Sequence, residues 1–226
     1  MRQLGIITGD IVASQDINPT ERKVLYAGLK RFLLYLKQDK KIEAFEMFRG
    51  DSFQCVVKEK RLSLRLALMI RTYILSFVDD SRKKSPKKPV PQTLKGYIYA
   101  KQDVRLSIGI GAIDFYDPKT VAHSDGEAFR LSGEALDGMK KTPYRMSVRT
   151  YDSGFSTSLE PSILLMDALI QKWTSNQAEA VRYKLQEWKE EQISEALGIS
   201  QSAVSQRIKT AQWYAIEKLL TYFEMF

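Results

Sequence analysis

Cysteine, histidine and long apolar runs are almost missing from this chain of 226 residues. Its single cysteine, Cys55, cannot form a disulfide within the chain, and its apolar surroundings predict a small core residue rather than a nucleophile. The single histidine, His123, has no second histidine or cysteine nearby with which to bind a metal, so we expect a loop residue. No apolar run is long enough to cross a bilayer, and no apolar leader opens the sequence. These absences predict a cytoplasmic protein without a membrane partner.

The net charge of +8 lies in the first two thirds of the chain. Residues 1–154 hold 28 Lys and Arg against 18 Asp and Glu, whereas residues 155–226 hold 7 against 9. Much of the excess is in the segment SRKKSPKKPVPQTLKG at 81–96, where prolines and clustered like charges oppose regular structure. This segment is either a solvated loop or an arm that contacts phosphates.

The apolar spacing alternates between the periods of strands and helices over residues 3–151. The order strand, helix, strand, strand, helix, strand predicts an α+β, ferredoxin-like (βαββαβ) domain, to which one more helix and one more strand are added. The expected elements are a strand at 3–8, a helix capped by Thr20 with apolar residues at 25, 29, 32, 33 and 36, hairpin strands at 42–48 and 52–57, a helix at 61–78, a strand at 104–115, a helix at 125–140 and a strand at 145–151.

The character of the sequence changes to helices alone after Gly154. Serine and threonine cluster with this glycine at 152–158, which is typical of a boundary between domains. We therefore expect a ferredoxin-like domain at 1–154 and an all-α module at 155–226.

Two aspartates occupy corresponding ends of the predicted sheet. Asp10 follows Gly9 at the exit of the first strand, and Asp51 follows Gly50 at the tip of the hairpin. If the third strand lies beside the first, the two carboxylates converge and repel each other unless a cation joins them. Mg²⁺ favours such a site, completed by phosphates and water. The alternative is that both are ordinary turn residues, since Gly-Asp pairs are common in turns.

Three stretches carry a resemblance to known proteins. TGDIVAS, FRGDSFQCVV and VRLSIGIGA are similar to the metal-bearing strand, the Gly-Asp hairpin and the next strand of the palm-like domain of class III nucleotide cyclases. With SDGEAFRLSGEAL and the terminal helices, the chain more closely resembles the SatD family of bacterial proteins. The resemblance implies a Mg²⁺ site in which Asp10 and Asp51 are ligands and the carbonyl of Ile11 is a third.

The resemblance also indicates where a nucleotide would bind. In the cyclases a late helix carries an asparagine and, four residues further on, an arginine that stabilise the transition state; the matching positions here are Phe129 and Gly133. Neither side chain can do this. Arg130, Lys140 and Lys141 are then the candidates for phosphate contacts. The alternative for the lysine pair is a helix C-terminus whose dipole it complements.

The segment EEQISEALGISQSAVSQRIKTAQW, at 190–213, has helix-turn-helix spacing. Gly198 allows a left-handed turn and Ser200 can cap the second helix, as in sigma-factor region four and in LuxR-type and Cro-type regulators, which the segment resembles. The outward face suits DNA bases and phosphates, whereas the alternative is a helical bundle for protein contacts. The candidate DNA-binding residues are Gln201, Ser202, Ser205, Gln206, Arg207 and Lys209, with Thr210 at the margin.

An apolar stripe at 213–223 ends the sequence, with Trp213, Ile216, Leu220 and Phe223 at helical spacing. It packs either on residues 163–173 of the same chain or on a second copy in a homodimer. Together these features predict a DNA-binding transcriptional regulator whose first domain binds a nucleotide or a divalent metal. The alternatives are a Mg²⁺-dependent nucleotidyl transferase or cyclase and, more weakly supported, an interaction scaffold.

Overall fold

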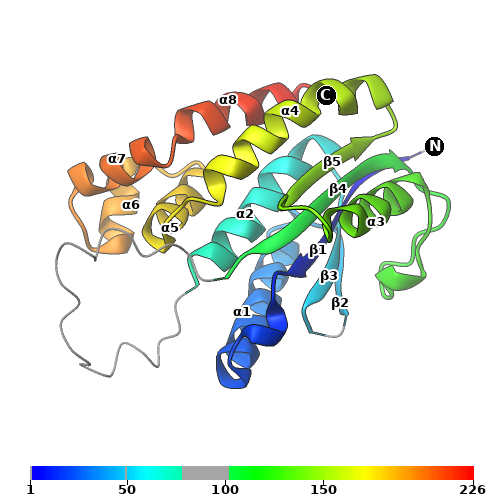
Figure 1. The fold of residues 1–226 in the computed structure, drawn as a ribbon, viewed down its shortest axis with the longest axis horizontal. Coiled ribbons are helices and arrows are strands. Elements are labelled where there is room, and N and C mark those ends of the chain that lie inside the picture. Colours follow the sequence, from blue (N-terminus) through cyan, green and yellow to red (C-terminus); the bar gives the residue numbers. More distant parts are fainter. Residues whose placement is uncertain (1, 49, 78–101) are drawn as a thin grey trace.

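The computed structural model describes residues 2–48, 50–77 and 102–226 (Figure 1). The basic segment predicted at 81–96 lies outside the described residues. The strands are β1 (Gln3–Ile11), β2 (Ala44–Phe48), β3 (Ser52–Val57), β4 (Val104–Ala112) and β5 (Met146–Thr150), and the helices are α1 (Pro19–Gln38), α2 (Ser63–Leu75), α3 (Glu127–Met139), α4 (Ser153–Ile170), α5 (Ser175–Lys184), α6 (Glu190–Leu197), α7 (Gln201–Thr210) and α8 (Trp213–Glu224), with short 3-10 turns at Ser14–Asp16, Lys60–Leu62 and Val121–His123.

The described strands form one mixed sheet in the order β2-β3-β1-β4-β5. Neighbouring strands are antiparallel except β4 and β5, which are parallel. The predicted α+β class and its βαββαβ order are therefore confirmed, and β3 lies beside β1 as expected.

Each face of the sheet carries its own apolar cluster because side chains alternate along a strand. In β1, Ile7 and Ile11 belong to the larger cluster with α1 and α2, whereas Leu4 and Ile6 belong to a smaller one with Phe129 of α3. Helices α1 and α2 thus cover one face and α3 covers the other (Figure 1).

The cap of helix α1 lies two residues before the predicted one. The side chain of Asn18 accepts a hydrogen bond from the backbone nitrogen of Thr20 at 2.9 Å, and Pro19 occupies the first helical position. Proline suits that position because its missing N–H would have no partner there in any case. The cap of α1 is therefore Asn18 rather than Thr20.

The C-terminal helices pack on the α+β part rather than standing apart from it. The position 154/155 lies inside α4, and α4 packs along β5 while α5 packs on α2. Leu159, Ile163 and the apolar residues of α8 are buried in the same cluster as α2. The apolar stripe of α8 is thus covered within the chain, the first of the two arrangements that the sequence leaves open.

A buried arginine links α2, the start of β4 and α4. Arg71 is fully buried and donates to both carboxylate oxygens of Asp103, at 2.9 Å each, and to Asp167 at 2.6 Å. Burial lowers the pKa of Arg71, but attraction and hydrogen bonds from the two aspartates outweigh it and raise the pKa above its ordinary value. Arg71 therefore remains charged and satisfies both carboxylates.

Within the described ranges, no helix combines the length and the apolar character that crossing a bilayer requires.

Candidate metal and nucleotide site

The exit of β1 and the tip of the β2–β3 hairpin meet at one rim of the sheet. Asp10 lies opposite Ser52 of β3 and Arg105 of β4. The backbone nitrogen of Ile11 donates to the carbonyl of Asp51 at 3.0 Å. Asp10 and Asp51, which are far apart in sequence, are thus brought to the same rim.

The hairpin tip is shaped by Gly50, whose φ of 88° is in the left-handed region that favours glycine. Asp51 follows it, and its carboxylate is oriented by hydroxyl groups. Ser14 donates to Oδ2 at 2.8 Å, and Ser52 lies 3.5 Å from Oδ1. No sequence pattern points to Ser14, which reaches this rim through the 3-10 turn after β1.

Asp10 is held in a different way. Its Oδ2 accepts from Nη1 of Arg105 at 2.8 Å, and both side chains are only 17% exposed. Its Oδ1 is buried and has no hydrogen-bond partner among the described residues, and the same holds for Nε of Arg105. A buried carboxylate oxygen without a partner is unfavourable, and a cation beside it would remove that cost.

The residues present fit a hard cation only in part. In the described part of the chain, no three acidic, histidine or cysteine side chains gather closely enough to bind a metal by themselves. Two carboxylates with oxygen ligands from the backbone, phosphate or water match the preference of Mg²⁺, which seldom uses an all-protein cage. Asp10, Asp51 and the Ile11 carbonyl are the residues that would hold it.

The predicted phosphate-binding residues separate along α3. Lys140 follows the last turn of this helix, and its pKa is raised by a hydrogen bond to Asp137 at 2.6 Å and, to a smaller extent, by Asp10, while Arg105 lowers it. Lys140 is therefore within electrostatic reach of the rim, and Lys141 is exposed next to it. Arg130, about 15 Å away along the helix, forms ion pairs with Asp114 and Asp125 at the far end of α3.

The structure adds Arg105 to the candidate residues. It is the one charged residue in β4, and its place opposite Asp10 follows from the register of β1 and β4. A single charged residue in a strand with no other charge is visible in the sequence and could have marked Arg105 as a candidate. Its partner could not be named because the register of two distant strands is set by the whole sheet.

The two α3 positions that match the catalytic residues of the cyclases offer no polar group. Phe129 is buried in the smaller apolar cluster, and Gly133 has no side chain, with open space where one would lie. Among the described residues, the predicted phosphate candidates at the rim end of α3 are Lys140 and its neighbour Lys141, which follow the helix.

The candidate DNA-binding residues share one helix. Gly198 ends α6 with a φ of 62°, and the hydroxyl of Ser200 accepts from the backbone nitrogen of Ala203 at 3.3 Å, so both predicted turn features are present. Val204 and Ile208 are buried beneath α7. Gln201, Ser202, Ser205, Gln206 and Lys209 are exposed on α7, and Arg207 is half-buried with Glu179 at 3.7 Å.

No family model and no curated protein matches the chain. Among solved structures, it is similar to a bacterial light-regulated adenylyl cyclase (15% identity, 65% of this chain and 74% of the other, TM-score 0.41). It is also similar to an adenylate cyclase from Trypanosoma brucei (18%, 60% and 68%, 0.46) and to the adenylyl cyclase CyaB from P. aeruginosa (11%, 71% and 81%, 0.43). These similarities concern the arrangement of helices and strands alone, and each TM-score is below 0.5.

Proposed function

We propose that the chain binds a nucleotide together with Mg²⁺ at the rim formed by β1, the β2–β3 hairpin and the start of β4. The observation that carries the proposal is the buried Oδ1 of Asp10, which has no partner among the described residues and lies at the same rim as Asp51. Such an oxygen is a ready ligand for a cation. This deepens the sequence-based prediction by assigning a role to each group at the rim.

The residues divide into two roles. Asp10 and Asp51 hold the cation, which when bound neutralises phosphate charge and orients phosphate oxygens. Arg105 donates through Nη1 to Asp10, and its guanidinium places a positive charge at the rim that favours phosphate. Lys140 supplies a second, more exposed positive charge at the end of α3.

Binding of a nucleotide at this site and catalysis of its conversion require different groups. Phe129 is buried and Gly133 lacks a side chain, so α3 offers nothing there to stabilise charge that develops on a transferring phosphate. We therefore propose nucleotide binding as the function of the rim. The alternative, a nucleotidyl transferase or cyclase, requires product from nucleoside triphosphates and Mg²⁺ that disappears in Asp51→Ala.

Asp51→Asn should weaken Mg²⁺-dependent binding of ATP or GTP about ten- to a hundredfold, because it removes one of two anionic ligands. Isothermal titration with each nucleotide at fixed Mg²⁺ measures this. Asp39→Asn is the matched control, since Asp39 caps the opposite end of α1, about 30 Å along that helix, and its side chain is 44% exposed. Equal affinities in wild type and Asp51→Asn would show that the rim is not the site.

DNA binding through α7 is a second candidate function. It is supported by the left-handed turn at Gly198, the cap at Ser200 and the exposed polar side chains of α7, which are the features of a recognition helix. A chain that binds DNA through α7 and a nucleotide at the rim would be a nucleotide-responsive regulator. Reading two half-sites would also require a homodimer, which sedimentation in the presence of DNA would detect.

Gln206→Ala and Arg207→Ala should each weaken binding to a specific DNA fragment by about 1–3 kcal/mol if the side chain contacts a base. Gel-shift titration on genomic fragments measures the loss, with Gln38→Ala at the exposed end of α1 as control. If no fragment binds more tightly than nonspecific DNA, or if Gln38→Ala has the same effect, α7 is not a recognition helix.

A further inference from the structure

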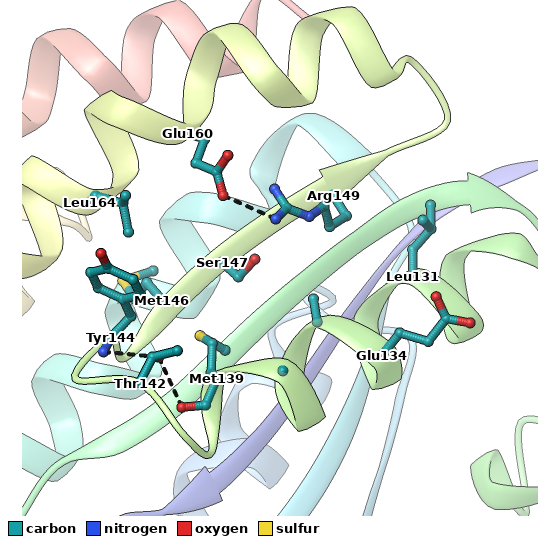
Figure 2. A pocket seen from close by; sticks show the side chains of 12 residues that line it. Leu131, Glu134, Met139, Thr142, Tyr144, Met146, Ser147, Arg149, Glu160 and Leu164 are labelled. Atoms are coloured by element: carbon teal, nitrogen blue, oxygen red, sulfur yellow. Dashed lines mark hydrogen bonds and ion pairs between the residues drawn. The ribbon is translucent and has the colours of Figure 1, made fainter.

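A cavity of about 530 Å³ lies beside β5, and none of the rim residues lines it (Figure 2). Its volume is within the range of small-molecule sites in proteins. Its walls come from one side of α3, the segment that leads into β5, β5 itself and α4. The lining residues are Leu131, Glu134, Ala135, Gly138, Met139, Thr142, Tyr144, Met146, Ser147, Arg149, Glu160 and Leu164.

The cavity exists because the described sheet ends at β5. Helix α3 lies on one side of this last strand and α4 lies along it, which leaves a space between the two helices (Figure 2). The small residues Ala135 and Gly138 leave space on the α3 side of the cavity. At Gly138, in the last turn of α3, an added Cβ would meet no atom within 4 Å, so packing against the described residues does not require glycine there.

The base of the cavity is apolar and rich in sulfur. Met139 and Met146 are only 5% and 1% exposed, whereas Leu131, Leu164 and Tyr144 are partly exposed and provide most of the apolar surface open to a ligand. Thioethers make favourable contacts with aromatic rings and adapt to their shape. These residues suit a flat aromatic group.

The charges of the lining favour a cation. Arg149 and Glu160 pair with each other at 3.0 Å, as the dashed line in Figure 2 marks. Glu134 has no hydrogen bond or ion pair in the described part of the chain, so the lining carries one net negative charge in a protein of net charge +8. A positively charged ligand is favoured there over an anionic one.

The open edge of β5 adds hydrogen-bond acceptors. The backbone nitrogen of Tyr151 donates to Ile110 of β4, whereas that of Thr150 donates to Ser156 of α4. Because peptide directions alternate along a strand, the peptide of Met146 faces the same side as that of Thr150, away from β4. Its carbonyl and the hydroxyl of Ser147 can accept from an amine.

We propose that this cavity binds a small arylalkylamine, a flat ring that carries a protonated amine. The ring packs on the α3 wall at Leu131 and Ala135, which are partly exposed. The ammonium group lies toward Glu134, which is three residues after Leu131 on the same helix. This site is separate from the rim, so the proposal does not depend on nucleotide binding.

Tryptamine is the probe, titrated into the full chain and followed by ligand-observed NMR, with indole-3-propionate as a size-matched anion. Tryptamine should bind more tightly than the acid. Glu134→Gln should reduce its affinity about two- to fivefold, as expected for a largely exposed charge pair. Gly138→Leu, which fills the cavity from α3, should reduce affinity at least about tenfold.

Gly133→Leu is the matched control, since Gly133 is on the same helix with equally open surroundings but does not line the cavity. It should bind tryptamine like wild type, and circular dichroism melting confirms that each variant is folded. The proposal is overturned if tryptamine does not bind, if the acid binds as tightly, or if Gly138→Leu retains wild-type affinity. If Gly138→Leu does not fold, the proposal is tested by two other comparisons: the tryptamine affinity of Glu134→Gln against that of wild type, and the affinity of wild type for tryptamine against that for indole-3-propionate.

Discussion

Arg71→Met should lower the free energy of unfolding by about 3–5 kcal/mol, the range measured when one partner of a buried ion pair is removed. The variant keeps the bulk of the side chain but leaves Asp103 and the fully buried Asp167 without their cation. Among the described residues, Asp167 would retain as donors the backbone nitrogen of Arg145 and the amide of Gln171. Urea unfolding measures the change.

Arg61→Met provides the comparison, because Arg61 pairs with Glu59 on the surface, and both side chains are more than half exposed. Its loss should cost under about 1 kcal/mol. Adding Asp167→Asn to Arg71→Met should recover part of the stability, since it removes a buried charge. If Arg71→Met were as mild as Arg61→Met, the three charges would not act as a buried unit.

Gly109→Ala should also be strongly destabilising, by about 3 kcal/mol, the upper part of the range for overpacked interiors. Gly109 lies in β4 under α3, where an added Cβ would overlap the carbonyl oxygen of Ala128 and lie 2.7 Å from the backbone nitrogen of Ser132. Backbone atoms cannot move out of the way as the end of a flexible side chain can, so α3 as a whole must shift away from the sheet. Thermal unfolding followed by circular dichroism measures the loss.

The same substitution at Gly133 should have the opposite sign. An alanine there meets no atom within 4 Å, and replacing glycine by alanine inside a helix stabilises by roughly 1 kcal/mol. A melting temperature lowered equally by both substitutions would mean that close approach of α3 to β4 is not the cause. Because α3 carries Lys140 to the rim, Gly109→Ala should weaken nucleotide binding as well.

Much of the fold is contained in local patterns. Alternation and helical spacing predict the strands, the hairpin and the helices, and the βαββαβ order places β3 beside β1 and hence Asp51 near Asp10. The pairing of Arg105 with Asp10 depends on strand register. The burial of Arg71 escapes prediction because its partners are Asp103, directly before β4, and Asp167 of α4, which are distant in sequence and arranged by the tertiary fold.

The phosphate candidates also show what local patterns can and cannot predict. Arg130 and Lys140 belong to one predicted helix, and the sequence does not show which of them lies closer to Asp10. Only the packing of α3 across the sheet shows that its last turn, rather than its first, points to the rim. Cavities escape prediction for a related reason, since the space beside β5 depends on how two helices flank a strand.

Helix α2 has neighbours on both sides: the sheet strands β1 and β4 on one, and α5 and α8 on the other. The C-terminal helices are therefore part of the hydrophobic core, because their removal would expose α2 to water. Helix α7 contacts α5 and α8, which both pack on α2, and Arg71 of α2 pairs with Asp103 directly before β4, so the C-terminal helices and the carboxylate rim are joined through one helix.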